Sequence, residues 1–370
     1  MVTRSRGLFV IVSHTLRAAE VGYGTGDVGS KFLPLNLLDL GTFGVCLFFA
    51  LSGCTLYVAN ASKVKAVCDI PHFYLKRILR IWPAFAISMI VFVVFTKVFI
   101  SLYTGDRSLW IGQFETPYSI GDVFRYLFLV SDMTGPRTII NGAYWSLPIE
   151  FRYYLLLPIV FLLIRTRVIG IAAALLISVL LYDVLYHQSS IPMNRYEFFQ
   201  LGFTFFGGVV IAALFHSVSW RIRFLYSLVL FAVCIAVASA LRWDYIPMPK
   251  TGFFSDILNC YGVIAVVCVF LVMYAKPISV ETWFTNRLYN YGLVSYSIYL
   301  YHMLFVGIAV IMVVRFDIYG SYEKLAFIFL LTFFGSYCTA IIGYRFVERP
   351  FIELGKGKRT RSIPYPEATN

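Results

Sequence analysis

Charged residues are scarce in this sequence. Only 14% of its 370 residues are Asp, Glu, Lys or Arg, whereas 59% are hydrophobic; soluble globular domains carry about 25% charged residues. The mean hydropathy of the whole chain is +0.77, and a soluble core of this size has no room for that much apolar surface. The scarcity of charge therefore excludes an ordinary soluble domain and favours a polytopic integral membrane protein whose apolar faces contact lipid.

The sequence also lacks the patterns of disulfide-bonded and metal-binding proteins. Its seven cysteines form no CxxC pair and lie mostly inside apolar runs, where cysteine acts as a small packing residue. Its five histidines are spread along the chain without the spacing of metal ligands. We therefore predict no metal site and no permanently bound cofactor. There is no signal-peptide cleavage site, so the hydrophobic segments themselves are expected to direct membrane insertion.

Apolar runs that approach the thickness of a bilayer recur along the chain. A hydrocarbon core about 30 Å thick takes about 20 residues of helix. Nine runs come close to this length and a tenth, shorter run begins at Gly7, so we predict an all-α fold of about ten transmembrane helices. Residues 1–352 form the expected membrane domain, and residues 353–370 form a basic, proline-containing cytoplasmic tail. The other nine runs are Phe43–Val58, Ile81–Leu102, Trp145–Ile164, Val168–Tyr186, Phe198–Phe215, Phe224–Leu241, Ile257–Ala275, Leu293–Val314 and Leu325–Tyr344.

The distribution of cations predicts an orientation. The net charge of +12 resides mainly in short loops between apolar runs, which favours lipid head groups over nucleic acid as the partner. With a cytoplasmic N-terminus, the inner segments hold about twice as many Lys and Arg residues as the outer ones, as the positive-inside rule requires. We expect both termini in the cytoplasm and a multi-pass protein of the plasma or bacterial inner membrane. One long outer loop, Tyr103–Tyr144, is either a lid or a connector.

Ionisable residues within membrane helices are costly, so they are the first candidates for function. His14, in the first helix, can accept a proton from a hydroxyl near neutral pH; alternatively, it is a histidine hydrogen-bonded to a neighbouring helix. Glu150 shares a helix face with Ser146 and Tyr153. It either orients a histidine or is a structural carboxylate paired with an arginine such as Arg17.

A pair of arginines and a second histidine are further candidates. Arg77 and Arg80 lie on one helix face at the predicted cytoplasmic edge. Guanidinium pairs bind phosphate oxygens in a bidentate manner, although such a pair also serves as an ordinary positive-inside anchor. His302, among three tyrosines, is either part of a site or part of a packed aromatic layer.

Six segments stand in a characteristic order: VIVSH ending at His14, FGVCLFFALSG (Phe43–Gly53), FYLKRILRIWP (Phe73–Pro83), YWSLPIEFRYYLLLP (Tyr144–Pro158), YSIYLYH ending at His302, and YRFVERPF (Tyr344–Phe351). They cover essentially the whole chain. In this order they resemble the acyltransferase 3 family of membrane proteins. The resemblance implies about ten membrane helices and transfer of an acyl group, usually acetyl, from acyl-coenzyme A. The implied acceptor is a hydroxyl of a saccharide, such as a surface polysaccharide, a lipid-linked glycan or an exopolysaccharide.

The resemblance also implies roles for individual residues. His14 matches the family's catalytic histidine, and Glu150 matches the glutamate of its Trp-Ser-Leu-x-x-Glu motif. Arg77 and Arg80 match an Arg-x-x-Arg pair that meets coenzyme A. The remaining candidates are Ser146, Tyr153, His302 and Glu348. Two departures are that Cys46 stands where the family often has an acid, and that no residue clearly corresponds to the family's arginine before the histidine.

Two mechanisms and a rival function remain open. His14 either removes the proton from the acceptor hydroxyl, with Glu150 orienting or charge-balancing it, or carries the acyl group itself. A transporter or flippase of a lipid-linked saccharide is the alternative function. It is expected to show an internal repeat or paired broken helices, and the sequence shows neither. The acceptor, the acyl length and the oligomeric state are left open.

Overall fold

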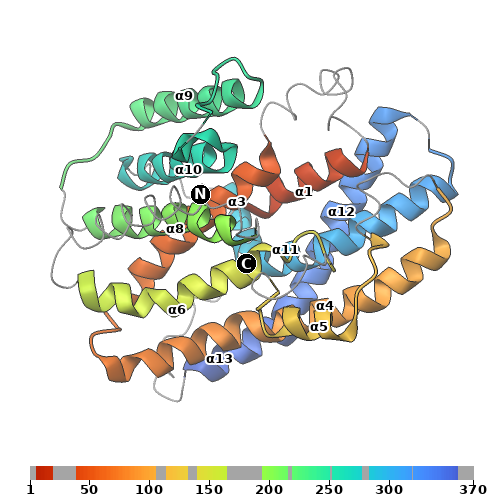
Figure 1. Cartoon of the computed structure of the whole chain (residues 1–370), viewed down its shortest axis with the longest axis horizontal. Coiled ribbons are helices and arrows are strands. Elements are labelled where there is room, and N and C mark those ends of the chain that lie inside the picture. The colour runs from red at the N-terminus through yellow and green to blue at the C-terminus, as the bar shows by residue number, and fades with distance from the viewer. Residues whose placement is uncertain are drawn as a thin grey trace.

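The computed structural model describes residues 6–19, 39–105, 114–131, 140–164, 194–215, 219–250, 252–276, 283–318 and 320–356. Within these ranges the regular structure is helical, apart from an isolated bridge between Ile222 and Ala275 (Figure 1). The longer helices are α1 (Arg6–Ala18), α3 (Leu40–Asn60), α4 (Ile70–Leu102), α6 (Ser146–Ile164), α8 (Asn194–Phe215), α9 (Phe224–Arg242), α10 (Ile257–Tyr274), α11 (Trp283–Arg315) and α12 (Ser321–Gly343). The shorter ones are η3 (Val67–Asp69), α5 (Ile120–Leu127), η5 (Phe253–Ser255), the π-helix η6 (Tyr344–Glu348) and α13 (Arg349–Lys356).

The expected all-helical fold is confirmed for the described residues. Seven of their helical segments are long and apolar enough to cross a membrane. Every predicted apolar run in the described part of the chain coincides with a helix, including the short run at Gly7, which is α1. The run Val168–Tyr186 and most of the tail lie outside the described residues. The total of ten spans and the cytoplasmic termini therefore stay predictions.

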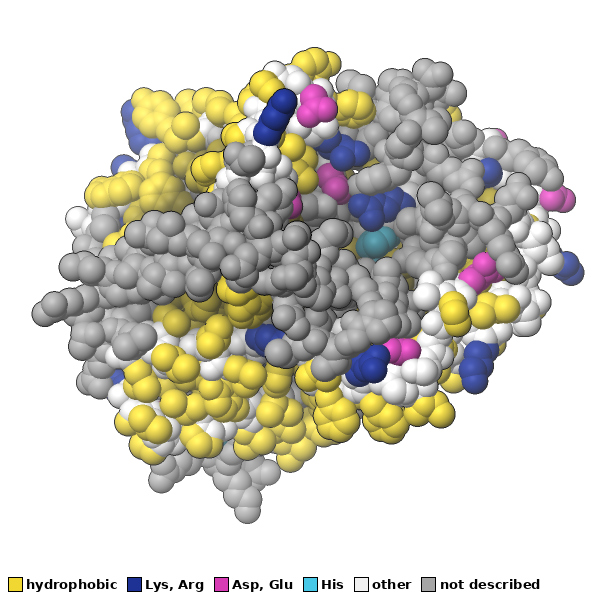
Figure 2. All heavy atoms as spheres, viewed as in Figure 1, with side chains coloured by type: hydrophobic (Ala, Val, Ile, Leu, Met, Phe, Trp, Pro, Cys, Tyr) yellow, Lys and Arg dark blue, Asp and Glu magenta, His cyan; other side chains and the backbone are white. Residues whose placement is uncertain are grey.

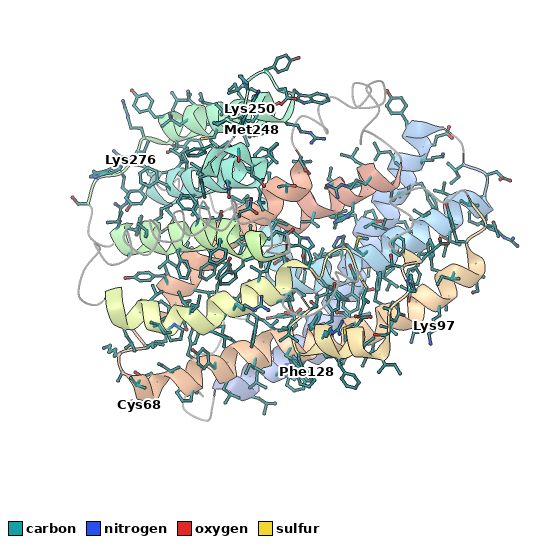
Figure 3. The ribbon with its side chains drawn as sticks, in the orientation of Figure 1. Cys68, Lys97, Phe128, Met248, Lys250 and Lys276 are labelled. Atoms are coloured by element: carbon teal, nitrogen blue, oxygen red, sulfur yellow. The ribbon has the colours of Figure 1, made fainter. Side chains whose placement is uncertain are left out.

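Most of the longer helices run lengthwise in Figure 1, with α3 and α12 oblique to them, so the molecule has two ends. Figure 3 shows Cys68 and Lys276 at one end and Lys97 toward the other. At the first end, the Ile222 amide donates to the Tyr274 carbonyl and the Lys276 amide to the Ile222 carbonyl, each at 2.8 Å. Two loops that the charge pattern assigns to the same membrane face are thus joined at one end of the bundle.

An outward apolar surface matches a lipid environment. On α4, Ile90 and Val94 are 60% and 58% exposed, and on α9, Leu225 and Val229 are 64% and 54% exposed. Figure 2 shows hydrophobic side chains gathered over α9 and along α4. Contiguous apolar patches of this kind are rare on water-soluble monomers, so lipid is the medium that accounts for them.

The segment between α4 and α6 returns along α4 instead of staying beyond the end of the bundle. The Tyr118 hydroxyl shares a hydrogen bond of 2.8 Å with Thr96, and the Trp82 indole donates to the Leu127 carbonyl at 2.9 Å. Because Thr96 and Trp82 are roughly 21 Å apart along the helix axis, the segment descends beside α4, and Figure 3 places Phe128 between the two ends. The described part of this predicted outer loop is therefore packed into the bundle.

Helix α1 lies between two apolar clusters. One cluster joins α3, α6, α8 and α10, and the other joins α4 and α11 with the segment before α6. Helix α1 packs against α3, α11 and α12, and its Leu16 belongs to the second cluster. The polar residues of α1 are thereby held between the two halves of the molecule.

Helices α3 and α8 approach each other closely at two glycines. A Cβ atom added to Gly53 would lie 2.0 Å from the Phe205 carbonyl oxygen, and one added to Gly208 would lie 1.9 Å from the Ala50 carbonyl oxygen. Small residues allow this approach in membrane helices, where packing drives association. The position of α3, which lines the site described below, depends on these two glycines.

Gly53→Ala is expected to lower the free energy of unfolding by about 1–3 kcal/mol, because a backbone carbonyl cannot move aside as a side chain can. Thermal unfolding of the purified protein in detergent measures the change. Gly121→Ala is the matched control, since its added Cβ would lie 3.4 Å from the Ser119 hydroxyl, an ordinary contact. Equal melting temperatures for the two variants would contradict the close approach of α3 and α8.

Candidate functional site

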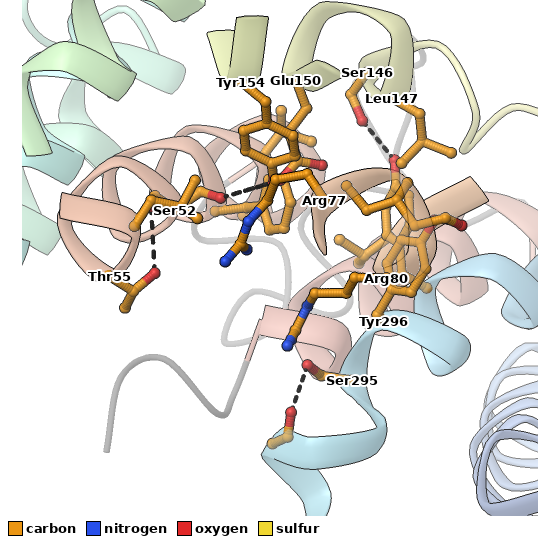
Figure 4. Close-up of a pocket in the computed structure, with 18 of the residues that line it drawn as sticks. Ser52, Thr55, Arg77, Arg80, Ser146, Leu147, Glu150, Tyr154, Ser295 and Tyr296 are labelled. Atoms are coloured by element: carbon orange, nitrogen blue, oxygen red, sulfur yellow. Dashed lines mark hydrogen bonds between the residues drawn. The ribbon is translucent and has the colours of Figure 1, made fainter. Parts of the chain in front are cut away.

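The arginine pair lies on α4 before the apolar run of that helix begins. Helix α4 begins at Ile70, whereas its apolar run begins at Ile81, so Arg77 lies roughly 10 Å along the helix. Arg77 is half-buried and Arg80 is exposed. Both line a cavity of about 280 Å³ among α1, α3, α4, α6 and α11. Figure 4 shows the two guanidinium groups extending in the same direction, with Glu150 and Tyr154 behind them on α6.

Glu150 anchors a hydrogen-bonded group at the wall of this first cavity. Its carboxylate is buried, with the residue 4% exposed. Its Oε1 accepts from the Ser52 hydroxyl of α3 at 3.0 Å and from the Tyr154 hydroxyl one turn along α6. The Ser52 and Tyr154 hydroxyls lie 3.3 Å apart. Because a buried carboxylate needs donors, this group fixes α3 against α6 beside the arginines.

His14 lines a second cavity, of about 550 Å³, between α1, α3, α8 and α10. Arg17, one turn along α1, lines it too and lies 3.8 Å from the Asp39 carboxylate. Asp39 caps α3 by accepting from the Thr42 amide at 3.3 Å and from its hydroxyl at 2.7 Å. In Figure 2, a histidine lies beside basic side chains in a hollow of the surface that faces the viewer.

His302 lies against His14, with the ring centroids 5.1 Å apart and the planes at 44°. His302 is fully buried, and its Nδ1 lies 2.8 Å from the Tyr299 carbonyl oxygen. Because a carbonyl only accepts, Nδ1 carries the proton and Nε2 is an acceptor. Within the described part of the chain, this Nε2 has no hydrogen-bond partner. The two histidines are the only pair of predicted site residues that the described structure places in ring contact.

Three wall residues are common to both cavities: Val10, Val45 and Tyr299. The predicted residues are thus divided, with Arg77 and Glu150 on one side of this wall and His14 on the other. An orienting contact from Glu150 to His14 stays a prediction.

The other sequence candidates have different surroundings. The Ser146 hydroxyl lines the first cavity and shares a hydrogen bond of 2.8 Å with Tyr299. Tyr153 lies outside both cavity linings, where its hydroxyl donates to the Phe198 carbonyl. Glu348 is buried at η6 and accepts from the Ser297 hydroxyl of α11. Tyr153 and Glu348 therefore contribute to helix packing in this structure.

Two residues that line the cavities are not among the residues that the sequence predicts. Ser52 lies in the segment Phe43–Gly53, where the sequence gives no signal that separates it from serines that bond their own helix backbone. Gln200 is 4% exposed on α8 and lines the second cavity. Its presence in an apolar run is the same signal that identified Glu150. Among the described residues, no group of three His, Cys, Asp or Glu side chains is arranged to hold a metal ion.

Comparison with known proteins decides the family. A family model described as an acyltransferase domain, Acyl_transf_3, matches residues 7–345. The chain belongs to the acyltransferase 3 family. Residues of both cavities fall within the matched range, so this acyltransferase 3 protein carries its candidate site inside the family domain.

One curated relative of this acyltransferase 3 protein is a viral protein. "Putative acetyltransferase ORF330" of Acidianus two-tailed virus is 25% identical over 281 residues, which are 74% of this chain and 76% of the viral protein. No solved structure matches this chain.

Tyr154→Phe is expected to lower the free energy of unfolding by about 1–3 kcal/mol, because it removes one buried donor to the Glu150 carboxylate. Tyr57→Phe on α3 is the control, since Tyr57 is half-buried and makes ring contact with Phe161, which phenylalanine preserves. Thermal unfolding in detergent compares the two. A Tyr154 variant as stable as the Tyr57 variant would show that the Glu150 group does not hold α3 and α6 together.

Proposed function

We propose that the protein transfers an acyl group, expected to be acetyl, from acyl-coenzyme A to a hydroxyl of a saccharide. The observation that carries this proposal is the pair of adjoining cavities. One contains two arginines suited to a phosphate-bearing donor, the other contains a histidine suited to deprotonating a hydroxyl, and Val10, Val45 and Tyr299 line both.

The first cavity suits the donor. Within the described part of the chain, neither Arg77 nor Arg80 belongs to an ion pair, and both line the cavity. Guanidinium groups bind phosphates through two parallel hydrogen bonds, and coenzyme A carries several phosphate groups. The two arginines lie in the half of α4 nearer its start, which the charge pattern assigns to the cytoplasm, where coenzyme A thioesters are made.

The second cavity suits an acceptor rich in hydroxyls. Its lining includes the carboxylates of Glu197 and Asp256, the Gln200 amide and the Trp145 ring. The Gln200 amide nitrogen is buried and has no hydrogen-bond partner in the described part of the chain. Carboxylates and amides bind sugar hydroxyls, and an aromatic ring packs against the apolar face of a sugar. These groups support a saccharide over an apolar alcohol.

The proposed chemistry uses His14 as the general base. As its ring nitrogen accepts the hydroxyl proton, the acceptor oxygen attacks the thioester carbonyl, the carbon–sulfur bond breaks, and the coenzyme A thiolate leaves and is protonated. His302 acts as a positioning residue, because its acceptor Nε2 can hold a ring N–H of His14. In the covalent variant, the His14 nitrogen attacks first and later releases the acyl group to the hydroxyl.

The membrane arrangement follows from the same assignment. We propose about ten spans in the plasma or bacterial inner membrane, with both termini in the cytoplasm. Donor and acceptor then reach the half-buried His14 from separate cavities, so water-filled space does not need to cross the whole bundle.

Arg77→Ala with Arg80→Ala is expected to raise the KM for acetyl-coenzyme A at least tenfold while changing kcat less, because phosphate contacts bind ground state and transition state alike. Release of the free thiol from acetyl-coenzyme A in nanodiscs measures both constants. Arg223→Ala is the control, because Arg223 is an exposed cation at the same end of the bundle. An unchanged KM in the double variant would refute the donor assignment.

His14→Ala is expected to reduce thiol release with a saccharide acceptor by 100-fold or more, the range in which general bases contribute. His72→Ala is the matched control, since His72 is exposed at the start of α4. With radiolabelled acetyl-coenzyme A, label retained on the wild-type chain indicates the covalent route. Absence of turnover and of binding, with acetyl and longer donors and crude glycan acceptors, would reject the acyltransfer proposal for this chain.

A further inference from the structure

The three residues that stand between the two cavities, which we call the aperture residues or the aperture, come from three helices. Val10 comes from α1, Val45 from α3 and Tyr299 from α11, and each lines both cavities. Val10 and Val45 are buried, at 7% and 8% exposed. Because the three side chains belong to separate helices, the space between them widens only if one helix moves or one of these side chains is made smaller.

Tyr299 is held in place from several sides. Its hydroxyl donates to the Ala143 carbonyl and lies 2.8 Å from the Ser146 hydroxyl. Its own carbonyl accepts from His302, and the Phe48 ring stacks parallel to its ring, with an interplanar angle of 3°. A ring fixed at its hydroxyl, its face and its backbone cannot rotate away to admit a larger group.

We infer that this aperture sets the length of the acyl group, so that Val10, Val45 and Tyr299 restrict the donor to short acyl chains. The inference rests on the proposed function. If the arginines hold the phosphates in the first cavity and His14 acts from the second, the thioester carbon has to lie where the cavities meet. The coenzyme A arm then occupies the first cavity, the acceptor occupies the second, and the acyl chain is left with the space beside the aperture residues.

The physical basis of the selectivity is packing. Two buried valines and a fixed tyrosine leave no flexible side chain to yield, and inserting extra methylene groups into a close-packed site is unfavourable. Each methylene of mismatch changes the selectivity of an enzyme by roughly tenfold or more. Shortening a valine to alanine removes two methyl groups at the aperture and should restore space for a longer chain.

The test compares acetyl-, butanoyl- and hexanoyl-coenzyme A in nanodiscs, with methyl glucoside as the acceptor probe and release of the free thiol as the readout. The wild-type protein is expected to use the acetyl donor best. Val45→Ala is expected to raise the ratio of butanoyl to acetyl turnover roughly tenfold, and Val10→Ala should change it in the same direction. A ratio measured on one preparation is insensitive to partial loss of folded protein.

Val306→Ala is the matched control, because Val306 is a fully buried valine on α11 that lies outside both cavity linings. It should leave the ratio unchanged. Two outcomes would overturn the inferred acyl-length selectivity while leaving the proposed function intact. One is a wild-type protein that uses hexanoyl-coenzyme A as well as acetyl-coenzyme A. The other is His14-dependent turnover whose butanoyl-to-acetyl ratio is the same in all four proteins. No His14-dependent release from any donor would overturn both.

Discussion

A carboxylate buried in an apolar bundle is the constraint around which the site is arranged. Glu150 can remain there only if donors reach it, and Ser52 of α3 and Tyr154 of α6 do so. Satisfying this one group brings α3 and α6 together at a fixed depth and leaves a polar-walled space beside Arg77 of α4. An aliphatic residue at this position would allow α3 and α6 to pack in several registers, whereas a hydrogen-bonded carboxylate favours one.

The division of the core into two clusters complements that constraint. Helix α1 packs between them, so its polar residues face neighbouring helices and not lipid. The Asp39 cap on α3 also lies beside Arg17 of α1, which ties the start of one helix to the end of the other. The candidate base and the candidate phosphate ligands are thereby held by different helices, and their separation depends on rigid packing between them.

The site residues that the sequence identified were those whose polarity is expensive in a membrane. His14 and Glu150 stand out from apolar surroundings, whereas the arginine pair stands out by its spacing at the predicted membrane edge; the structure places each of them on a cavity wall. The same reasoning could not separate Tyr153, which bonds a neighbouring backbone carbonyl, from Ser146, which lines a cavity. Tyr153 and Ser146 both lie on the Glu150 side of α6. Helical spacing predicts which side of a helix a residue occupies, but it does not predict which groups of the neighbouring helix lie opposite.

The sequence by itself determined the medium, the helical class and the family, because hydrophobic run length and the order of motifs are properties of the chain in one dimension. It also predicted most helix positions, although α4 begins eleven residues before its apolar run because polar and basic residues are tolerated where the helix leaves the hydrocarbon. Only the tertiary structure decided that the long segment after α4 descends beside it, that two histidines far apart in the chain meet, and that Val10, Val45 and Tyr299 stand between two cavities. Those outcomes depend on which helices become neighbours and at what depth. The sequence does not specify this, because a helix face that packs against lipid and one that packs against another helix have the same hydrophobic pattern.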